Sequence, residues 1–308
     1  MSVDWKRLRC EHLGEAHPRL LPPSLKLPIL PAAVQEFNRL ADDPEASLVD
    51  LGRVVESDCG LTAQLLRMVN SAALGLKKKA SSAQQAIAVL GVRSVRLHLL
   101  AAGMQLAMKT HKSKLINMTA FWHTNLERAF VARQVAELLG ADENLAFSAS
   151  LLHDFLLPML TNELFDDYLR FSETPEDVRR PLVDFEAETF GWDHARASAH
   201  VLLAWGLPDD LVCAVLWHHR GLQLLSDVEL GRTAAAAVAV AGLVPDPLRQ
   251  ARGGLKHLLW LHEHWPEFDL PRIAEYAAQQ LHFLSPAAGQ HFTLQRRLEK
   301  YTAGLAEK

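Results

Sequence analysis

The chain has 308 residues, of which 49% are hydrophobic and 22% charged, and it carries a net charge of −4 at pH 7. This balance is typical of a folded globular protein and excludes a disordered or fibrous chain. No run reaches the roughly 20 apolar residues that cross a bilayer, since the best candidate, Ala234 to Val244, is too short. The N-terminus has mixed charge and lacks the apolar centre of a secretion signal, so we expect a cytoplasmic protein without a membrane segment.

The three cysteines, Cys10, Cys59 and Cys213, are odd in number and far apart. This pattern predicts neither a disulfide framework nor a zinc site built from cysteines. Reduced thiols are consistent with the expected cytoplasmic location.

Charge is distributed unevenly along the chain. Residues 59–126 contain no Asp or Glu but nine Lys and Arg, so this segment is +9 and the remainder is −13. A block of one sign can attract an anionic partner such as nucleic acid or a cyclic dinucleotide, or it can dock on the acidic remainder of the same chain. We favour the second interpretation, because charged helix faces usually just contact water or each other. Under the first interpretation, the candidate anion-binding residues are Lys77, Lys78, Lys79, Arg93 and Arg96.

Helix start and stop signals alternate along the first half of the chain. Ser47, Asp58 and the pair Ser81–Ser82 stand where N-caps are expected, and Gly91 stands where a helix should stop. Apolar residues recur at helical spacing between these signals. The predicted helices are a short lead helix before Pro22, then Pro31–Asp42, Leu48–Glu56, a helix after Asp58 whose inward stripe is Leu61, Leu65, Leu66 and Val69, then Ala83–Leu90, and a helix from Ser94 to Met108.

The same signals continue through the second half. Gly140 and Gly191 mark helix ends, while Asp142, Asp193 and Pro208 mark helix starts. We find no convincing strand, and therefore predict an all-α, multi-helix fold. The predicted helices are Thr119–Leu139, a helix that starts at Asp142 and is bent or ended by Pro158, one that starts at Thr174–Pro175, then Pro181–Phe190, His194–Trp205, Asp209–His219, Ala234–Val244, Leu255–His264, Pro271–Leu284 and Gln295–Leu305.

The segment SASLLHDFLLPML, from Ser148 to Leu160, places an adjacent His153 and Asp154 inside an apolar helix that must be buried. Such a pair can supply two ligands of one metal ion. It can equally be a hydrogen-bonded pair that fixes the packing of the core, because buried polar groups are nearly always paired. The two residues by themselves leave both interpretations open.

Several ordered motifs resemble one known family. They are LPILPAAVQEFNRLADDPEASLVDLGRVVESDCGLTAQLLRMVNSAALGL, SSAQQAIAVLGVRSVR, FW, HD and FGWDHARASAHVLLAWGLPDDLVCAVLWHH. Together they resemble the HDOD domain, the HD-related output domain of bacterial signalling proteins. The resemblance covers residues 20–220, and it implies an N-terminal helical bundle over 20–114 and an HD-like part over 115–220. Residues 1–19 are then a helical lead, and residues 221–308 a helical C-terminal extension.

HDOD domains are related to HD phosphohydrolases, whose sites use a His, an adjacent His and Asp, and a later Asp around metal ions that activate water. His153 and Asp154 match the adjacent pair. Thr124 stands where the first His is expected, and His123 lies one position early, about 100° away around a helix. Gly242 stands where the later Asp is expected. The Gly-Lys turn of the enzymes is replaced by Phe-Leu-Leu, and the GYP motif of the related cyclic dinucleotide phosphodiesterases is absent.

Three further histidines, His194, His218 and His219, match positions at which HD-GYP enzymes bind a second metal. With His153 and Asp154 they form either a residual site for an iron, zinc or manganese ion, or a vestigial set held by mutual hydrogen bonds. We favour the vestigial set and expect no cofactor, because two ligands that the resemblance implies are missing. Any cofactor that does bind is expected to be a divalent transition metal.

The resemblance and its departures lead to a primary hypothesis. The chain is a non-catalytic bacterial signal-transduction module that acts through protein interaction or ligand sensing, with a degenerate HD site and no catalytic residue. The alternative is a metal-dependent phosphohydrolase with a nucleotide or phosphodiester substrate. A second alternative makes residues 59–126 a binding face for nucleic acid or a cyclic dinucleotide. We expect a separate signalling protein as partner, since the alternation of strands and helices of a fused receiver domain is not found.

Overall fold

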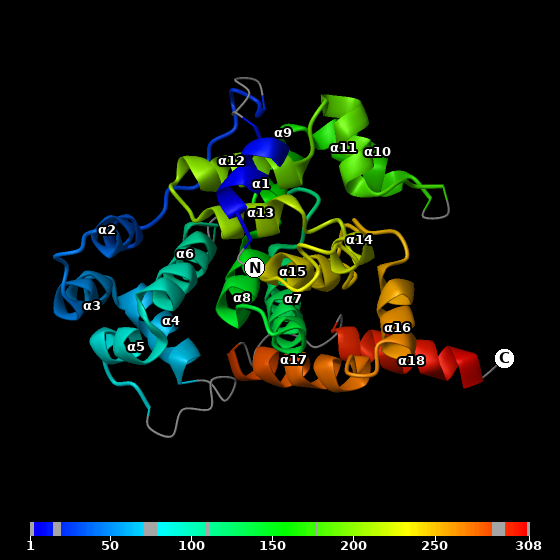
Figure 1. Ribbon diagram of the computed structural model, residues 1–308. Helices are drawn as coiled ribbons and strands as arrows, with labels where there is room; N and C mark the ends of the chain where they lie inside the picture. Colours follow the sequence, from blue (N-terminus) through cyan, green and yellow to red (C-terminus); the bar gives the residue numbers. More distant parts are fainter. Residues whose placement is uncertain are drawn as a thin grey trace. The chain divides into compact units, whose positions relative to one another are not determined.

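We describe the protein from a computed structural model, shown in Figure 1. The structure describes residues 3–14, 20–70, 79–108, 111–175, 178–284 and 293–306. Within these ranges every regular element is a helix, which confirms the predicted all-α fold. None of the described helices is both long and apolar enough to cross a membrane.

Contacts within the chain divide it into two units. Unit 1 is made of Met1–Lys26, His111–Gln279 and Ala288–Lys308, and unit 2 of Leu27–Thr110 and Gln280–Ala287. Most of residues 221–308, predicted as a C-terminal extension, therefore belong to the same unit as the HD-like part.

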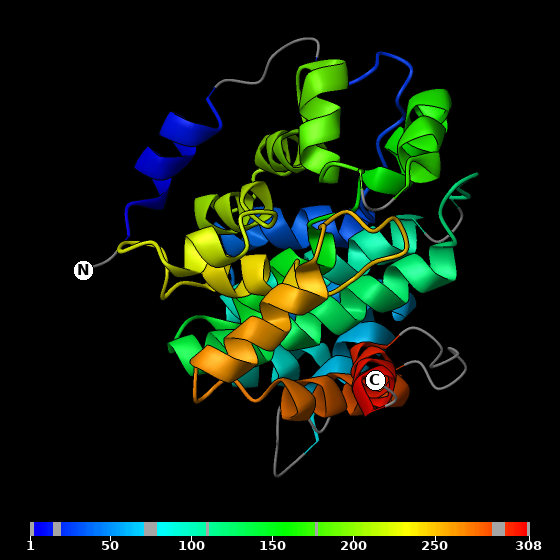
Figure 2. The same cartoon turned by 90° about the vertical axis from the view of Figure 1, so that its right-hand side faces the viewer.

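Unit 2 is a bundle of short helices, coloured blue to cyan in Figures 1 and 2. Its helices are α2 (Ala32–Ala41), α3 (Leu48–Glu56), α4 (Cys59–Val69), α5 (Ala83–Leu90) and α6 (Val92–Met108). Helix α2 packs on α3 and α6, and α5 packs on α3, α4 and α6. Gly103 permits the close approach of α6 to α2, because a Cβ at this position would lie 2.7 Å from Val34 Cγ2.

The N-caps predicted in unit 2 are confirmed. Ser47 and Asp50 form a capping box at the start of α3, with each side chain bonded to the backbone N–H of the other. Asp58 and Ser82 accept hydrogen bonds from the N–H groups that open α4 and α5. These side chains satisfy backbone donors that a helix cannot pair internally, which explains why the sequence marks these starts clearly.

One predicted start in unit 2 is wrong. Gly91 ends α5 with a φ of 81°, a conformation that glycine adopts at little cost, and α6 begins directly afterwards at Val92 rather than at Ser94. One glycine is sufficient to separate the two helices, so no loop precedes α6. The predicted inward stripe of α4 is otherwise correct, except that Leu66 is only half-buried.

Unit 1 contains the remaining helices of the described chain. They are α1 (Trp5–His12), α7 (Met118–Leu139), α8 (Glu143–Leu152), α9 (Leu157–Glu163), α10 (Phe165–Glu173), α11 (Leu182–Phe190), α12 (His194–Ala204), α13 (Asp209–Leu216), α14 (Leu222–Leu225), α15 (Ala234–Ala241), α16 (Gly254–His264), α17 (Leu270–Leu284), whose last residues belong to unit 2, and α18 (Leu294–Ala306).

The core of unit 1 lies around α15, which consists only of alanine and valine and is buried along its whole length. It packs against α7, α8, α13 and α14, and α7 and α8 pack tightly on each other (Figure 1). Small side chains let the backbones of neighbouring helices approach closely, so α15 can be surrounded on all sides. This packing brings the ends of α8, α13 and α15 close to the middle of α7.

The predicted position of His153 and Asp154 inside a helix is wrong. Helix α8 ends at Leu152, and the pair lies in the turn of residues 153–156 that leads into α9. Phe155 N–H donates to the Leu152 carbonyl, three residues back, so the chain makes tight turns here instead of continuing the α-helix. Pro158 sits in the first turn of α9, where its missing N–H costs nothing.

Other predicted helix boundaries also differ from the structure, and α15 ends at Ala241 rather than at the predicted Val244. Thr174 is the C-cap of α10 and does not start a helix, and residues 178–180 are not helical, while residues 176–177 lie outside the described chain. Helix α13 ends at Leu216, so His218 and His219 lie in the turn that follows it. A turn can direct consecutive side chains to one place more easily than a helix, in which neighbouring residues point about 100° apart.

Candidate functional site

The five His and Asp side chains predicted as site residues meet in unit 1. His153 and Asp154 come from the turn after α8, His194 is the first residue of α12, and His218 and His219 follow α13. All are buried except His219, which is half-buried. The fold therefore brings together residues that are up to 66 positions apart in the sequence.

Helix α7 contributes a guanidinium group to the same place. Arg128 is 1% exposed, and its Nη1 donates to Asp154 Oδ2 at 2.9 Å and to His153 Nε2 at 3.0 Å. Its Nε and Nη2 donate to the Val244 carbonyl at 3.0 and 2.7 Å, and Nη2 also donates to Asp246 Oδ2 at 3.1 Å. These acceptors engage the whole donor fork of the arginine. A fixed positive charge thus lies between the His153–Asp154 pair and a second carboxylate.

The two oxygens of the Asp154 carboxylate have different surroundings. Oδ2 accepts hydrogen bonds from Arg128 Nη1 and, at 2.7 Å, from Gln250 Nε2. Oδ1 faces away from these donors, toward His194 Nε2 at 3.2 Å and His218 Nε2 at 3.3 Å. One oxygen is therefore bonded to nitrogen donors, while the other faces a group of imidazoles.

Hydrogen bonds at the other ring nitrogens fix how these imidazoles are oriented. His218 Nδ1 donates to the Val215 carbonyl at 2.7 Å, and His194 Nδ1 donates to Glu186 Oε2 at 2.6 Å. A neutral imidazole that donates from Nδ1 carries its lone pair on Nε2. In their neutral forms, both rings therefore direct the Nε2 lone pair toward Asp154 Oδ1.

This arrangement fits a bound cation. Asp154 Oδ1 and His218 Nε2 are buried and make no hydrogen bond within the described chain, although they face each other. Two acceptors at this distance repel each other unless a proton or a metal ion lies between them. One ligand atom from each of Asp154, His194, His218 and His219 lies within 4.8 Å of the other three. Three imidazoles and one carboxylate are a donor set suited to zinc, iron or manganese.

Buried residues behind His194 hold its ring in place. Glu186 Oε2 accepts from the backbone N–H of His194 as well as from its Nδ1, and Glu186 Oε1 accepts from the Tyr168 hydroxyl at 2.6 Å. Such a carboxylate behind a histidine is typical of metal sites, where it orients the ring and makes Nε2 a better ligand. His219 Nε2 lies 3.0 Å from His194 Nε2 and completes the group.

Burial and mutual contact shift the pKa values of these groups in opposite directions. Burial acts to raise the pKa of Asp154, but the neighbouring side chains of His153, His194 and His218 lower it well below its usual value. Burial acts to lower the pKa of His194, but Glu186 and Asp154 raise it to about 10. Burial dominates at His218, whose pKa falls to about 4. Around a single carboxylate, one imidazole is therefore held charged and another neutral.

Comparison with known proteins identifies the family. A model of the HDOD domain matches residues 27–221, which is more than half of the chain. The chain belongs to the HDOD family. An uncharacterized protein of Treponema pallidum (strain Nichols) is 23% identical to this HDOD protein over 197 residues, which are 63% of this chain and 37% of that protein. The match thus spans little more than a third of the length of that relative.

Solved structures share the fold of this HDOD protein at low sequence identity. A "Putative phosphohydrolase" from Shewanella amazonensis SB2B has a TM-score of 0.62 at 20% identity, over 85% of this chain and 95% of that one. An HDOD domain protein of unknown function from Geobacter sulfurreducens has a TM-score of 0.55 at 18% identity, over 92% and 91%. A "Putative signal transduction protein" from Marinobacter aquaeolei VT8 has a TM-score of 0.56 at 21% identity, over 92% and 65%.

The candidate anion-binding residues do not belong to this site. Lys77 and Lys78 lie outside the described residues, while Lys79, Arg93 and Arg96 belong to unit 2. Lys79 and Arg93 are exposed, and Arg96 pairs with Asp42 at 2.7 Å. At least one charge of the basic segment is thus paired within the same unit.

Sequence reasoning missed Arg128, Asp246 and Glu186. Arg128 follows Thr124 by four residues, so the two share one face of α7, and this spacing was a usable signal once Thr124 had been placed at the site. Asp246 lies in the loop beyond α15, where Leu248 and Gln250 N–H groups donate to its carboxylate. No motif marks a loop acid of this kind. Glu186 resembles any other polar residue of an amphipathic helix until α11 is seen beside α12.

Proposed function

We propose that this HDOD protein is a non-catalytic signal-transduction module that acts through ligand sensing or protein interaction, its HD pair being held by Arg128 in place of a metal ion. The observation that carries this proposal is the guanidinium bonded to His153 Nε2, Asp154 Oδ2 and Asp246 Oδ2. These are the same kinds of ligand atom that HD phosphohydrolases offer to a metal. Here a side chain of the protein supplies the positive charge.

Electrostatics explains why the guanidinium and a metal exclude each other at this point. A metal ion at this point would need the lone pairs of His153 Nε2 and Asp154 Oδ2. Both atoms already accept hydrogen bonds from Arg128 Nη1, at 3.0 Å and 2.9 Å respectively. Arginine remains charged at any physiological pH, so it cannot yield by losing a proton. A divalent ion placed a few ångströms away would be strongly repelled in this buried site. A pair of metal ions that share the Asp154 carboxylate is therefore not expected.

The remaining ligands favour a rival function. Asp154 Oδ1, His194, His218 and His219 would hold a single divalent transition metal. Such an ion lowers the pKa of bound water and can generate a nucleophile. On this basis the rival is a metal-dependent phosphohydrolase, and the similar structure from Shewanella amazonensis is named a "Putative phosphohydrolase". In our proposal, any metal bound by these residues is structural, or is part of the sensing site.

Metal analysis and a hydrolysis assay separate the two functions. The protein is purified without chelator, its metal content is measured by mass spectrometry, and hydrolysis of bis-p-nitrophenyl phosphate and of nucleotides is followed with added manganese or iron. We expect no hydrolysis above that of the His153→Ala variant. His264→Ala, a change at an exposed histidine of α16, is the matched control. Our proposal fails if hydrolysis is lost in His153→Ala but kept in His264→Ala, with more than about half a metal ion bound per chain.

A signalling role further implies a partner protein. The Marinobacter aquaeolei relative is named as a signal transduction protein, which supports such a role without identifying the partner. We expect a separate signalling protein to bind this HDOD protein. Affinity capture from the native cell, with an Arg128→Met variant for comparison, would identify proteins whose binding depends on an intact site.

A further inference from the structure

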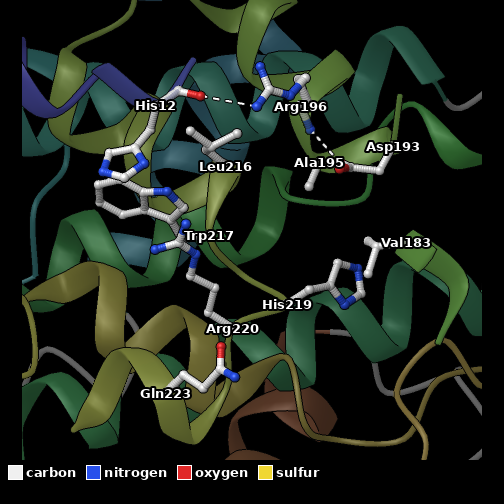
Figure 3. Close-up of a pocket in the computed structure, with 10 residues that line it drawn as sticks. All are labelled: His12, Val183, Asp193, Ala195, Arg196, Leu216, Trp217, His219, Arg220 and Gln223. Atoms are coloured by element: carbon white, nitrogen blue, oxygen red, sulfur yellow. Dashed lines mark hydrogen bonds between the residues drawn. The ribbon is translucent and has the colours of Figure 1, made fainter. Parts of the chain in front are cut away.

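A pocket in unit 1 opens beside the histidine group. It has a volume of about 270 Å³, close to the lower end of the range for small-molecule sites, which begins at about 300 Å³. Figure 3 shows the side chains that line it, among them His12 from α1, whose ring lies against Trp217, Arg196 from α12, and His219 and Arg220 from the segment after α13. His219 belongs both to this lining and to the group around Asp154.

The charge of this pocket is positive. Arg196 and Arg220 both line it, together with one carboxylate, Asp193. Asp193 accepts a hydrogen bond from a backbone N–H at the start of α12. The guanidinium of Arg196 donates to the carbonyls of Leu13 and His12 at 3.1 Å, which are neutral acceptors that fix its position. A pocket lined by two guanidinium groups, one of them fixed, attracts an anion.

Trp217 supplies an independent indication of a ligand. Its side chain is 2% exposed, yet the indole Nε1 makes no hydrogen bond within the described chain. Buried indole N–H groups usually find an acceptor. The ring lines the pocket, and the guanidinium of the exposed Arg220 lies 5.4 Å from its centroid. The indole ring of Trp217 and the guanidinium of Arg220 thus lie on the same wall of the pocket.

We propose that this pocket binds a small phosphate monoester, with Arg196 and Arg220 pairing the phosphate charge and the Trp217 N–H donating to one of its oxygens. A phosphate fits better than a carboxylate, because it offers three acceptor oxygens and a charge near −2 at neutral pH, which match three donor groups and two arginines. This inference rests on the proposed sensing function and names the class of ligand that is sensed. His219 connects the pocket to Asp154 through His194, so the ligand contacts a residue of the candidate metal group.

Calorimetric titration of the full chain tests the assignment. The probes are inorganic phosphate and adenosine 5′-monophosphate, which differ in the organic group, with acetate as the carboxylate comparison. The variants are Arg220→Gln and Trp217→Phe, and the matched control is Arg232→Gln, at an exposed arginine outside the lining. We expect both phosphate probes to bind, and Arg220→Gln to weaken binding by about ten- to a hundredfold, as for loss of a hydrogen bond to a charged group. Trp217→Phe should weaken binding by about three- to tenfold, and Arg232→Gln by less than about twofold.

The outcomes separate this inference from the proposed function. The inference is overturned if neither phosphate probe binds at about 10 mM, if Arg220→Gln binds as the wild type does, or if acetate binds as well as phosphate. Phosphorus NMR of the adenosine 5′-monophosphate samples, recorded with added manganese, detects hydrolysis. Release of phosphate by the wild type but not by His153→Ala would overturn the non-catalytic function and leave the pocket assignment standing. Binding without hydrolysis supports both.

Discussion

At the scale of single residues, the site depends on how one buried guanidinium is paired. Arg128 lies between the carboxylates of Asp154 and Asp246, with Nη–Oδ distances of 2.9 and 3.1 Å, and all three side chains are at most 5% exposed. A buried ion pair of this kind adds little net stability by itself, because removing the charges from water costs about as much as their attraction returns. Removing only one partner is costly, since the opposite charges then remain buried and unpaired.

We predict that Arg128→Met lowers the free energy of unfolding at pH 7 by about 3 to 5 kcal/mol. Methionine fills a similar volume but leaves Asp154 and Asp246 without a cation. Urea denaturation followed by circular dichroism measures the change. Arg232→Met, at an exposed arginine, should change stability by less than about 0.5 kcal/mol. A loss below about 1 kcal/mol for Arg128→Met would show that the carboxylates are not held by the guanidinium.

At the scale of elements, the end of α15 packs so closely against the turn that carries His218 that position 242 accommodates only glycine without a backbone shift. Gly242 is the C-cap of α15, and a Cβ added to it would lie 2.5 Å from the His218 carbonyl oxygen. An aspartate, which the resemblance to HD enzymes implies at this position, cannot be placed without moving the backbone of the turn that carries His218. The acid that reaches the site is Asp246, four residues later, in the loop.

We predict that Gly242→Ala destabilises the protein by about 1 to 3 kcal/mol, because the new methyl group meets backbone atoms that cannot rotate away. Thermal unfolding checks the magnitude. Gly60→Ala is a suitable comparison, since its Cβ would have no neighbour closer than Asp58 Oδ1 at 3.3 Å, and alanine favours helix. Equal stability of the two variants would mean that the turn at His218 can shift without cost.

At the scale of the whole molecule, residues from the C-terminal part of the chain complete the unit that contains the site. Glu127 of α7 accepts a hydrogen bond from the Leu294 N–H at the start of α18, at 2.7 Å. Glu127 is 2% exposed and precedes Arg128 in the sequence, so neighbouring residues of α7 contact the C-terminal helix and the HD pair. Burial raises the pKa of Glu127 to about 7, although the Leu294 N–H and the charges of Arg297 and Arg128 act to lower it.

This pKa predicts how stability depends on pH. A carboxyl group with a pKa of about 7 in the folded protein and 4.5 in the unfolded chain contributes stability below pH 4.5, and that stability is lost as the pH rises to 7. The glutamine of Glu127→Gln cannot ionise. The free energy of unfolding of this variant, relative to that of the wild type, should therefore rise by on the order of 1 to 3 kcal/mol between pH 4 and pH 8. Urea denaturation across this range measures the difference. Glu263→Gln, at an exposed residue of α16, should show no such gain, and a parallel pH profile for wild type and Glu127→Gln would refute the prediction.

The fold class and most helix boundaries follow from local signals in the sequence. Helix boundaries are set by residues that act within one or two turns of their own helix, such as the N-caps Asp58 and Ser82 and the terminating Gly91 at a positive φ. Such local effects can be predicted from the sequence. The HDOD motifs identified the family for the same reason, since each motif is a local pattern. The structure brings the five predicted side chains, His153, Asp154, His194, His218 and His219, close together, and their role as a site stays a prediction.

What surrounds those residues depends on the packing of the helices. The apolar segment around His153 favoured one continuous helix. The chain turns there instead, between the buried helices α8 and α9, and Pro158 lies in the first turn of α9, where it breaks no helical hydrogen bond. The roles of Arg128 and Asp246 depend on a contact between residues 118 positions apart. Two charges interact strongly only when they lie close together in a buried site. The packing of α7, α8 and α15 creates such a site, and residue positions in the sequence do not show it.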